Sequence, residues 1–274
     1  MKNIFFICMF GLLAFAGCSD NEEEILTGGN IDIDMLPPNQ PNDVIDEKLF
    51  AVINLDYPGL EKAKEFYNSG KYYYAVNELL EYYRNRTSVI NPNIQLMNTP
   101  ITASELNIAD QALENRFYVR GFAERVEDGK EIYYSFTKDN KIDWSFIPSK
   151  VTDQEFKYQI QAKAYRTSRD EKYAESWINV YSDWLKTFPY EEGTTFPEEG
   201  GKENDVDYQW KGLQVAERVI SQIDIMTYFI QSKNFTPEWL SVFLTAFAKE
   251  VECIRLNYYK EGNILVTQAQ AVAM

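Results

Sequence analysis

The 274-residue sequence contains no histidine. Catalytic triads that use an imidazole and zinc sites with histidine ligands are therefore excluded from this chain. It has only three cysteines, and two of them, Cys8 and Cys18, precede the expected folded part, so no disulfide can form within that part. The third, Cys253, lies in an apolar helical pattern and is expected to be a small buried side chain rather than a reactive thiol.

Basic residues are also scarce. Lys and Arg number 27 against 42 Asp and Glu, which gives a net charge of −15 and disfavours binding to nucleic acid. An anionic polysaccharide would be repelled at long range, but salt screens this repulsion beyond about 10 Å and leaves room for a local basic site. No phosphate-binding glycine loop is present, and the acidic loop from Thr187 to Asp207 lacks the EF-hand spacing. We therefore expect no cofactor and no metal.

The N-terminus has the layout of a secretory signal. Its apolar run from Ile4 to Ala16 is too short to span a bilayer as a permanent helix. Residues 15–18, Phe-Ala-Gly-Cys, resemble the lipobox of bacterial lipoproteins, and the acidic stretch that follows resembles a surface-export tag. We predict a signal peptide at residues 1–17 and lipidation of Cys18, with an ordinary cleaved signal as the alternative. The chain would then be exported and anchored to the outer membrane, facing the periplasm or the cell surface.

The chain divides into a tether and one folded domain. Residues 18–46 are acidic and rich in Asn and Pro, which is typical of a flexible tether, and folding is expected from residue 47 to residue 274. Helical spacing of apolar residues predicts helices over Leu60–Tyr83 with a break at 68–70, over 152–185, 210–230 and 236–262, and after residue 263. Between Arg84 and Lys150 the spacing weakens, so loops and a short hairpin at 127–130 are expected there.

Local signals predict where some helices begin and end. Ser168 with Glu171 fits a capping box, and Thr236 followed by Pro237 is a strong helix start. Gly262 is expected to end the helix that begins there. Successive amphipathic helices joined by loops indicate an all-α fold, either a helical bundle or a partial (α/α) toroid. The last helical pattern stops at Met274 with its apolar face incomplete, so we expect a fragment or truncated product whose C-terminal half is missing.

Five short motifs carry a family resemblance. They are Asn54-Leu-Asp-Tyr-Pro-Gly-Leu-Glu61, Leu80-Glu-Tyr-Tyr-Arg84, Ala164-Tyr-Arg-Thr-Ser-Arg-Asp-Glu-Lys-Tyr-Ala174, Trp210-Lys-Gly-Leu-Gln-Val-Ala-Glu-Arg218 and Glu261-Gly-Asn263. In this order they resemble the heparin-sulfate lyase branch of the heparinase II/III family. The resemblance implies an N-terminal α/α toroid that precedes a β-sandwich in the family, and cleavage of uronic-acid glycosaminoglycans such as heparan sulfate by β-elimination.

The resemblance also implies a role for Asn263. In the family an asparagine neutralises the uronate carboxylate, and its amide supplies the required donors. A position at the start of a helix would also aim the helix N-terminus at the anion, although Asn263 could instead simply cap that helix. Ile264 stands where many members have a histidine, and the family's catalytic tyrosine and second histidine fall beyond Met274. We therefore expect little or no turnover from this chain alone.

Four further residues are candidates for contact with the substrate. Arg218 could bind a sulfate or carboxylate through its forked guanidinium, or could instead pair with Glu217 or another acidic neighbour on its helix. Trp210, Tyr208 and Tyr165 could stack on sugar rings, although aromatics at helical spacing more often belong to a core. Two alternatives to a lyase domain remain at this point, a non-catalytic glycan-binding lipoprotein of the SusD kind and a degenerate remnant without a ligand.

Overall fold

The computed structural model describes residues 45–86, 100–118, 126–127, 130–131, 133–139, 141–144, 155–190 and 208–274. All of them belong to one compact unit, Pro38–Met274. The predicted signal peptide, Cys18 and the tether up to residue 44 lie outside the described residues, as do residues 191–207 of the acidic loop. Within the described ranges no helix is long and apolar enough to cross a membrane.

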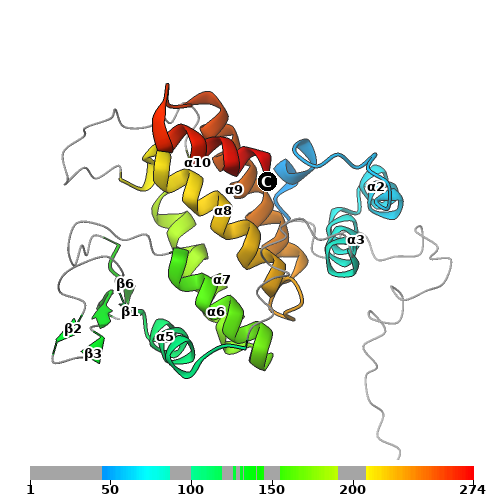
Figure 1. The fold of residues 1–274 in the computed structure, drawn as a ribbon. Coiled ribbons are helices and arrows are strands. Elements are labelled where there is room, and N and C mark those ends of the chain that lie inside the picture. Colours follow the sequence, from blue (N-terminus) through cyan, green and yellow to red (C-terminus); the bar gives the residue numbers. More distant parts are fainter. Residues whose placement is uncertain are drawn as a thin grey trace, which may run out of the picture. The chain divides into compact units, whose positions relative to one another are not determined.

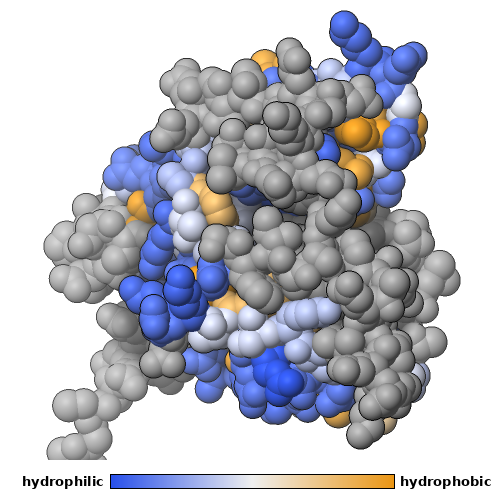
Figure 2. Space-filling model, turned by 90° about the vertical axis from the view of Figure 1, so that its left-hand side faces the viewer, coloured by the Kyte–Doolittle hydropathy of each residue, from blue (hydrophilic) through white to orange (hydrophobic). Residues whose placement is uncertain are grey.

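Helices dominate the described part of the chain, as predicted (Figure 1). They are α2 (Glu61–Asn68), α3 (Tyr72–Asn85), α5 (Ala103–Leu113), α6 (Glu155–Ser168), α7 (Lys172–Thr187), α8 (Gly212–Phe229), α9 (Pro237–Leu256) and α10 (Gly262–Ala273), with short 3₁₀ helices η3 (Glu47–Ala51) and η5 (Tyr208–Trp210). The predicted break between α2 and α3 and the long C-terminal helices are confirmed. Where the described surface is visible in Figure 2, hydrophilic side chains prevail and apolar ones are scattered among them.

Short strands occupy part of the region between α5 and α6. β1 (Arg116–Tyr118) pairs antiparallel with β4 (Tyr133–Ser135), and β5 (Thr137–Lys138) with β6 (Lys141–Ile142). β2 (Val126–Glu127) pairs with β3 (Lys130–Glu131), which confirms the hairpin predicted at 127–130.

Helix α5 was not predicted, because the expectation for this region was loops and short elements. Its apolar face is weak, with only the small side chains of Ala109 and Ala112 buried. The missed signal is at its start, where Thr102 accepts a hydrogen bond from the backbone N–H of Glu105 and the Glu105 carboxylate accepts from the backbone N–H of Thr102. This reciprocal pair is a capping box, which marks a helix start even where periodicity is poor.

Of the three helix boundaries predicted from local signals, one is confirmed and two are wrong. Thr236 caps α9, and its hydroxyl accepts from the backbone N–H of Trp239 at 3.3 Å. Ser168 is not the cap of α7, because its hydroxyl donates to the backbone oxygen of Ala164 inside α6. Gly262 does not end α9, which stops at Leu256; instead Gly262 is the first residue of α10 and has φ 87°, a conformation that glycine adopts without strain.

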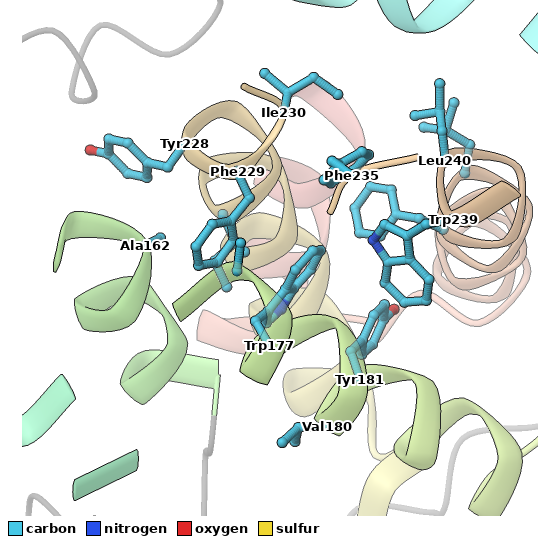
Figure 3. Close-up of a cluster of buried hydrophobic side chains, with 14 of the residues drawn as sticks. Ala162, Trp177, Val180, Tyr181, Tyr228, Phe229, Ile230, Phe235, Trp239 and Leu240 are labelled. Atoms are coloured by element: carbon cyan, nitrogen blue, oxygen red, sulfur yellow. The ribbon is translucent and has the colours of Figure 1, made fainter. Parts of the chain in front are cut away.

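An aromatic cluster forms the centre of the core (Figure 3). Trp177 of α7 is fully buried and stacks on Phe229 of α8, with ring centroids 5.2 Å apart, and on Phe235, at 6.1 Å. The ring of Trp239 on α9 meets it edge-on at 5.6 Å. Such pairs contribute about 0.5–1.5 kcal/mol each beyond the area that they bury, so this cluster fixes how α7, α8 and α9 pack.

Partly buried polar contacts hold the turn between α8 and α9. Arg84 of α3 donates from Nε to the backbone oxygen of Ile230 at 2.9 Å, and from Nη2 to those of Ser232 and Phe235, both at 3.1 Å. The last carbonyls of a helix have no partner within it, so the guanidinium supplies donors that α8 cannot provide. Arg84 therefore ties α3 to this turn.

A carboxylate also holds this turn. Glu171, the residue before α7, accepts a hydrogen bond from the Ser232 hydroxyl and one from Asn234 Nδ2 at 3.1 Å. The Tyr165 hydroxyl of α6 lies 3.4 Å from the other carboxylate oxygen. Two of the five motifs, ending at Arg84 and containing Glu171, thus meet at one turn.

Candidate functional site

The N-terminus of α10 carries Asn263 at its second position. The side chain is exposed, and the residue that caps the helix is Glu261, which makes no side-chain cap hydrogen bond. The prediction that Asn263 lies at a helix start is confirmed. Asn263 is not the N-cap residue, because that position is occupied by Glu261. Because the first backbone N–H groups of a helix lack intrahelical partners, an exposed amide here suits a carboxylate ligand.

The loop before α10 is fixed by buried contacts. Gln268, which is completely buried, accepts from the backbone N–H of Tyr259 at 2.9 Å and donates to the backbone oxygen of Asn257 at 3.2 Å. Gly212, at the start of α8, faces the same loop so closely that a Cβ there would lie 2.6 Å from Cε2 of Tyr259. The absence of a side chain at Gly212 therefore lets the start of α8 approach the loop that precedes Asn263.

Arg218 lies inside the helical packing. Only 3% of it is exposed, and Nε donates to Oε1 of Glu250 on α9 at 2.9 Å. Nη1 donates to the backbone oxygen of Gln209 at 3.0 Å, and the guanidinium carbon lies 4.3 Å from the ring centroid of Trp184 and 5.4 Å from that of Trp210. The ion pair joins two helices, where the sequence had suggested a partner on the same helix.

Trp210 lines a pocket between α7, η5 and α9. Its ring centroid is 5.9 Å from that of Trp184 and 5.6 Å from that of Tyr190. The pocket has a volume of about 190 Å³, and its walls are formed by Asp46, Trp184, Leu185, Phe188, Pro189, Tyr190, Trp210, Val242, Thr245, Ala246, Lys249 and Glu250. The walls are thus mainly apolar, with four aromatic side chains, and the polar groups come from Asp46 and from α9.

Two polar side chains in this pocket are almost completely buried. Glu250 is 2% exposed and Thr245 is 4% exposed, and among the described residues neither Oε2 of Glu250 nor the Thr245 hydroxyl has a hydrogen-bond partner. Burial raises the pKa of Glu250, and the positive charge of Arg218 offsets part of this effect. Sequence reasoning missed both residues. A usable signal existed, because Glu250 interrupts the apolar face formed by Phe247, Val251 and Ile254.

Two other residues considered in the sequence analysis, Tyr165 and Cys253, are not among the described residues that line this pocket. Tyr165 is 1% exposed and packs against Phe229 with centroids 5.4 Å apart, which is the core role that its helical spacing favoured. The side chain of Tyr208 lies outside the described residues. Cys253 is buried, as expected, and burial raises the pKa of its thiol to about 11. In the part of the chain that the structure describes, no group of Cys, Asp or Glu side chains is arranged to hold a metal ion.

The helical arrangement is that of part of an α/α toroid, and solved structures share it. The chain is similar to a crystal structure of heparinase III, with a TM-score of 0.73 and 43% identity over 84% of this chain and 34% of that one. It is also similar to the crystal structure of a heparan sulfate lyase from Pedobacter heparinus, with a TM-score of 0.65 and 30% identity over 82% and 34% of the two chains.

Residues 49–274 match the family described as Heparinase II/III N-terminus, and the chain belongs to that family. A heparin-sulfate lyase of Bacteroides thetaiotaomicron is 48% identical over 283 residues, which cover 100% of this chain and 38% of the relative. A heparin-sulfate lyase of Pedobacter heparinus is 30% identical over 234 residues, or 82% and 33%. The chain thus spans about two fifths or less of the length of these relatives.

Proposed function

We propose that this chain is the N-terminal helical domain of a polysaccharide lyase that cleaves heparan-sulfate-type glycosaminoglycans by β-elimination. The observation that carries the proposal is the match of residues 49–274 to the heparinase family, whose relatives here are named heparin-sulfate lyases. Since the chain covers only 38% of the relative to which it is 48% identical, the activity is proposed for a complete protein in which this domain is one part.

Asn263 is the residue to which we assign a direct role. In β-elimination the C5 proton of the uronate is removed, and this proton becomes acidic enough only when the charge on the adjacent carboxylate is neutralised. The exposed Asn263 amide supplies N–H donors, and the first turn of α10 adds backbone donors and the positive end of the helix dipole. Its placement at the end of a loop fixed by Gln268 supports this assignment.

The 274 residues on their own are proposed to turn over little or no substrate. Elimination also needs a base for the C5 proton and an acid for the leaving oxygen. The sequence has no histidine, and the family resemblance implies that the catalytic tyrosine and second histidine fall beyond residue 274. The remaining part of such a lyase would have to supply both groups.

The direct test is the rise of unsaturated-uronate absorbance during incubation with heparan sulfate. We expect a flat trace from these 274 residues, and a rise when the chain is joined to the C-terminal part of its Bacteroides thetaiotaomicron relative. In that joined protein Asn263→Ala should lower the rate by about 10²–10³-fold, the usual effect of removing one charge-stabilising donor. The matched control is Asn85→Ala, an exposed asparagine at the end of α3, which should leave the rate unchanged.

Two results would contradict the proposal. A rise from the 274 residues alone that vanishes in Asn263→Ala would show that they hold a working elimination site. A joined protein that binds heparan sulfate without cleaving it would instead favour the non-catalytic, SusD-like glycan-binding lipoprotein.

We also propose that the chain is exported and lipidated at Cys18, as an outer-membrane lipoprotein facing the periplasm or the cell surface. The support is the apolar run and the Phe-Ala-Gly-Cys junction at residues 15–18. Metabolic labelling with a radioactive fatty acid should mark the wild-type chain and not the Cys18→Ser variant. Equal labelling of both would contradict lipidation at this residue.

A further inference from the structure

A buried glutamine and the exposed Asn263 lie on different sides of α10. Gln268 is the seventh residue of this helix and is completely buried, whereas Asn263 is the second residue and is exposed. Five residues along an α-helix correspond to a rotation of about 140°, so the two side chains point to nearly opposite faces. Gln268 therefore does not touch a substrate that binds at Asn263, and any effect that it has on turnover is indirect.

The amide of Gln268 is used on the loop between α9 and α10. Oε1 accepts from the backbone N–H of Tyr259 at 2.9 Å, and Nε2 donates to the backbone oxygen of Asn257 at 3.2 Å. Asn257 in turn donates from Nδ2 to the backbone oxygen of Cys253 at 2.8 Å, in the last turn of α9. A buried hydrogen-bond network makes the backbone that it contacts rigid. One side chain thus joins α10 to the loop and, through Asn257, to the end of α9.

The start of α8 packs against the same loop. A Cβ at Gly212 would lie 2.6 Å from Cε2 of Tyr259 and 3.1 Å from Nε2 of Gln268. Real Cβ atoms do not approach a neighbour as closely as 2.6 Å, so a side chain at this position would displace Tyr259 or Gln268. Neither residue has room to move toward α8 in the wild-type packing.

We propose that Gln268 is a positioning residue for Asn263. Its amide fixes the loop from Asn257 to Glu261 and thereby sets where the first turn of α10 presents the Asn263 amide. This inference rests on the proposed function, because it concerns the carboxylate site that was assigned to Asn263 there. A misplacement of about 1 Å can lower a rate about 10²-fold, so a small shift of the loop should reach the chemistry.

The test measures kcat and KM for heparan sulfate in the protein joined to the C-terminal part of the Bacteroides thetaiotaomicron relative. Gln268→Met keeps the approximate size of the side chain and removes both hydrogen bonds. It should lower kcat about 10–100-fold and change KM less than about threefold, because the misplaced amide stabilises the transition state less while other contacts with the polymer persist. Gly212→Ala leaves the amide of Gln268 in place but crowds the loop, and it should also lower kcat.

A double-mutant cycle separates positioning from a general loss of stability. If Gln268 acts through Asn263, Gln268→Met should lower the remaining rate of the Asn263→Ala protein by less than about twofold, since the group that it positions is gone. A second measurement does not depend on cleavage. In the 274-residue chain, the backbone amides of residues 257–263 should exchange their hydrogens faster in Gln268→Met than in the wild type.

The matched control is Gln161→Met. Gln161 is also completely buried, and its Nε2 donates to the Ser176 hydroxyl at 3.3 Å, between α6 and α7. This variant should leave kcat and the exchange of residues 257–263 unchanged.

Three results would overturn the positioning role in a joined protein that cleaves and needs Asn263. They are a wild-type kcat in Gln268→Met, an equal loss of rate in the wild-type and Asn263→Ala backgrounds, and unchanged hydrogen exchange in the loop. If Gln268→Met does not fold, Gly212→Ala is judged by the same criteria. A joined protein that does not cleave, or whose rate is insensitive to Asn263→Ala, contradicts the proposed function and this role together, so the two failures can be told apart.

Discussion

Arg218 of α8 and Glu250 of α9 form an ion pair at 2.9 Å in which the two side chains are only 3% and 2% exposed. Removing two charges from water costs several kcal/mol per ion, which their mutual attraction repays only with good geometry and further hydrogen bonds. Arg218 makes one such hydrogen bond to the backbone oxygen of Gln209, and its guanidinium also makes cation–π contacts with the rings of Trp184 and Trp210. The pair therefore joins the two helices, and Glu250 also lines the pocket beside Trp210.

Breaking this pair on one side should be much more harmful than replacing both partners. We expect Glu250→Leu to lower the free energy of unfolding by about 3–5 kcal/mol, because it leaves a buried guanidinium without its carboxylate. Adding Arg218→Met should recover most of that loss, since no uncompensated charge then remains. Urea denaturation of the two single variants and the double variant measures the coupling.

The control for this cycle is the exposed pair of Glu252 and Arg255 on α9, whose side chains are 50% and 60% exposed. Glu252→Gln and Arg255→Met should each change stability by less than about 1 kcal/mol. If Glu250→Leu costs no more than these, or if the double variant is as unstable as the sum of the singles, the buried pair does not have the role assigned to it.

A single substitution can introduce a negative charge at the start of α10 while keeping the size of the side chain. Asn263→Asp places a carboxylate in the first turn, where the helix dipole should stabilise the chain by about 0.3–1 kcal/mol. The same carboxylate would repel the uronate, so the protein joined to a relative's C-terminal part should melt at an equal or higher temperature and lose its turnover of heparan sulfate. Thermal melts and the unsaturated-uronate assay measure the two effects.

Ser104→Asp is the matched control, because Ser104 is the exposed second residue of α5 as Asn263 is of α10. It introduces the same charge at a helix start outside the site, and the turnover should be unchanged. Retained turnover in Asn263→Asp would remove Asn263 from the proposed chemistry.

Acid should weaken the contact between α5 and α6. Lys163 Nζ lies 2.8 Å from Oε1 of Glu105. The hydrogen bond from Lys163, and next the backbone N–H of Thr102, lower the pKa of Glu105 to about 2. A carboxyl whose pKa is lower in the folded than in the unfolded chain stabilises the fold above the unfolded value of ~4.5, and this contribution is lost as the pH falls toward 2.

We therefore expect the stability difference between wild type and Glu105→Gln to be largest above about pH 5 and to shrink as the pH approaches 2. Its size should be on the order of 1 kcal/mol, because a third of the Glu105 side chain is exposed and solvent screens the pair. Denaturation curves between pH 2 and 7 measure it, with Glu65→Gln on the exposed face of α2 as the control. A difference that does not vary with pH would contradict the assignment.

The helices could be predicted wherever large apolar residues repeat with helical spacing. This holds for α7, α8 and α9, whose stripes include Trp177, Val219 and Phe243. Helix α5 escaped because it buries small alanines, and the end of α9 was misplaced because Gly262 has the conformation expected after a helix but lies at the start of the next one. Helical spacing of large apolar residues marks a buried helix face, so it gives no signal for a helix that buries little apolar surface.

The motifs that revealed the family have structural roles that the sequence did not show. Arg84 and Glu171 hold the turn between α8 and α9, and Gly212 lets α8 approach the loop before α10. The sequence left open whether Arg218 binds a substrate anion or pairs with an acidic neighbour on its own helix, and in the structure it pairs with Glu250, 32 positions further along the chain. Pairing between distant positions depends on how the helices pack, which a single sequence does not reveal.

The sequence by itself determined the all-α class, most helices, the family resemblance and the position of Asn263 at a helix start, because each depends on neighbouring residues or on a short motif. Only the tertiary structure decided that Trp184, Trp210, Thr245 and Glu250 share one pocket, and that Tyr165 belongs to the core. Those facts depend on how α7, η5 and α9 pack together. Packing is set by the sum of many weak contacts between residues far apart in the sequence, so no local pattern records it.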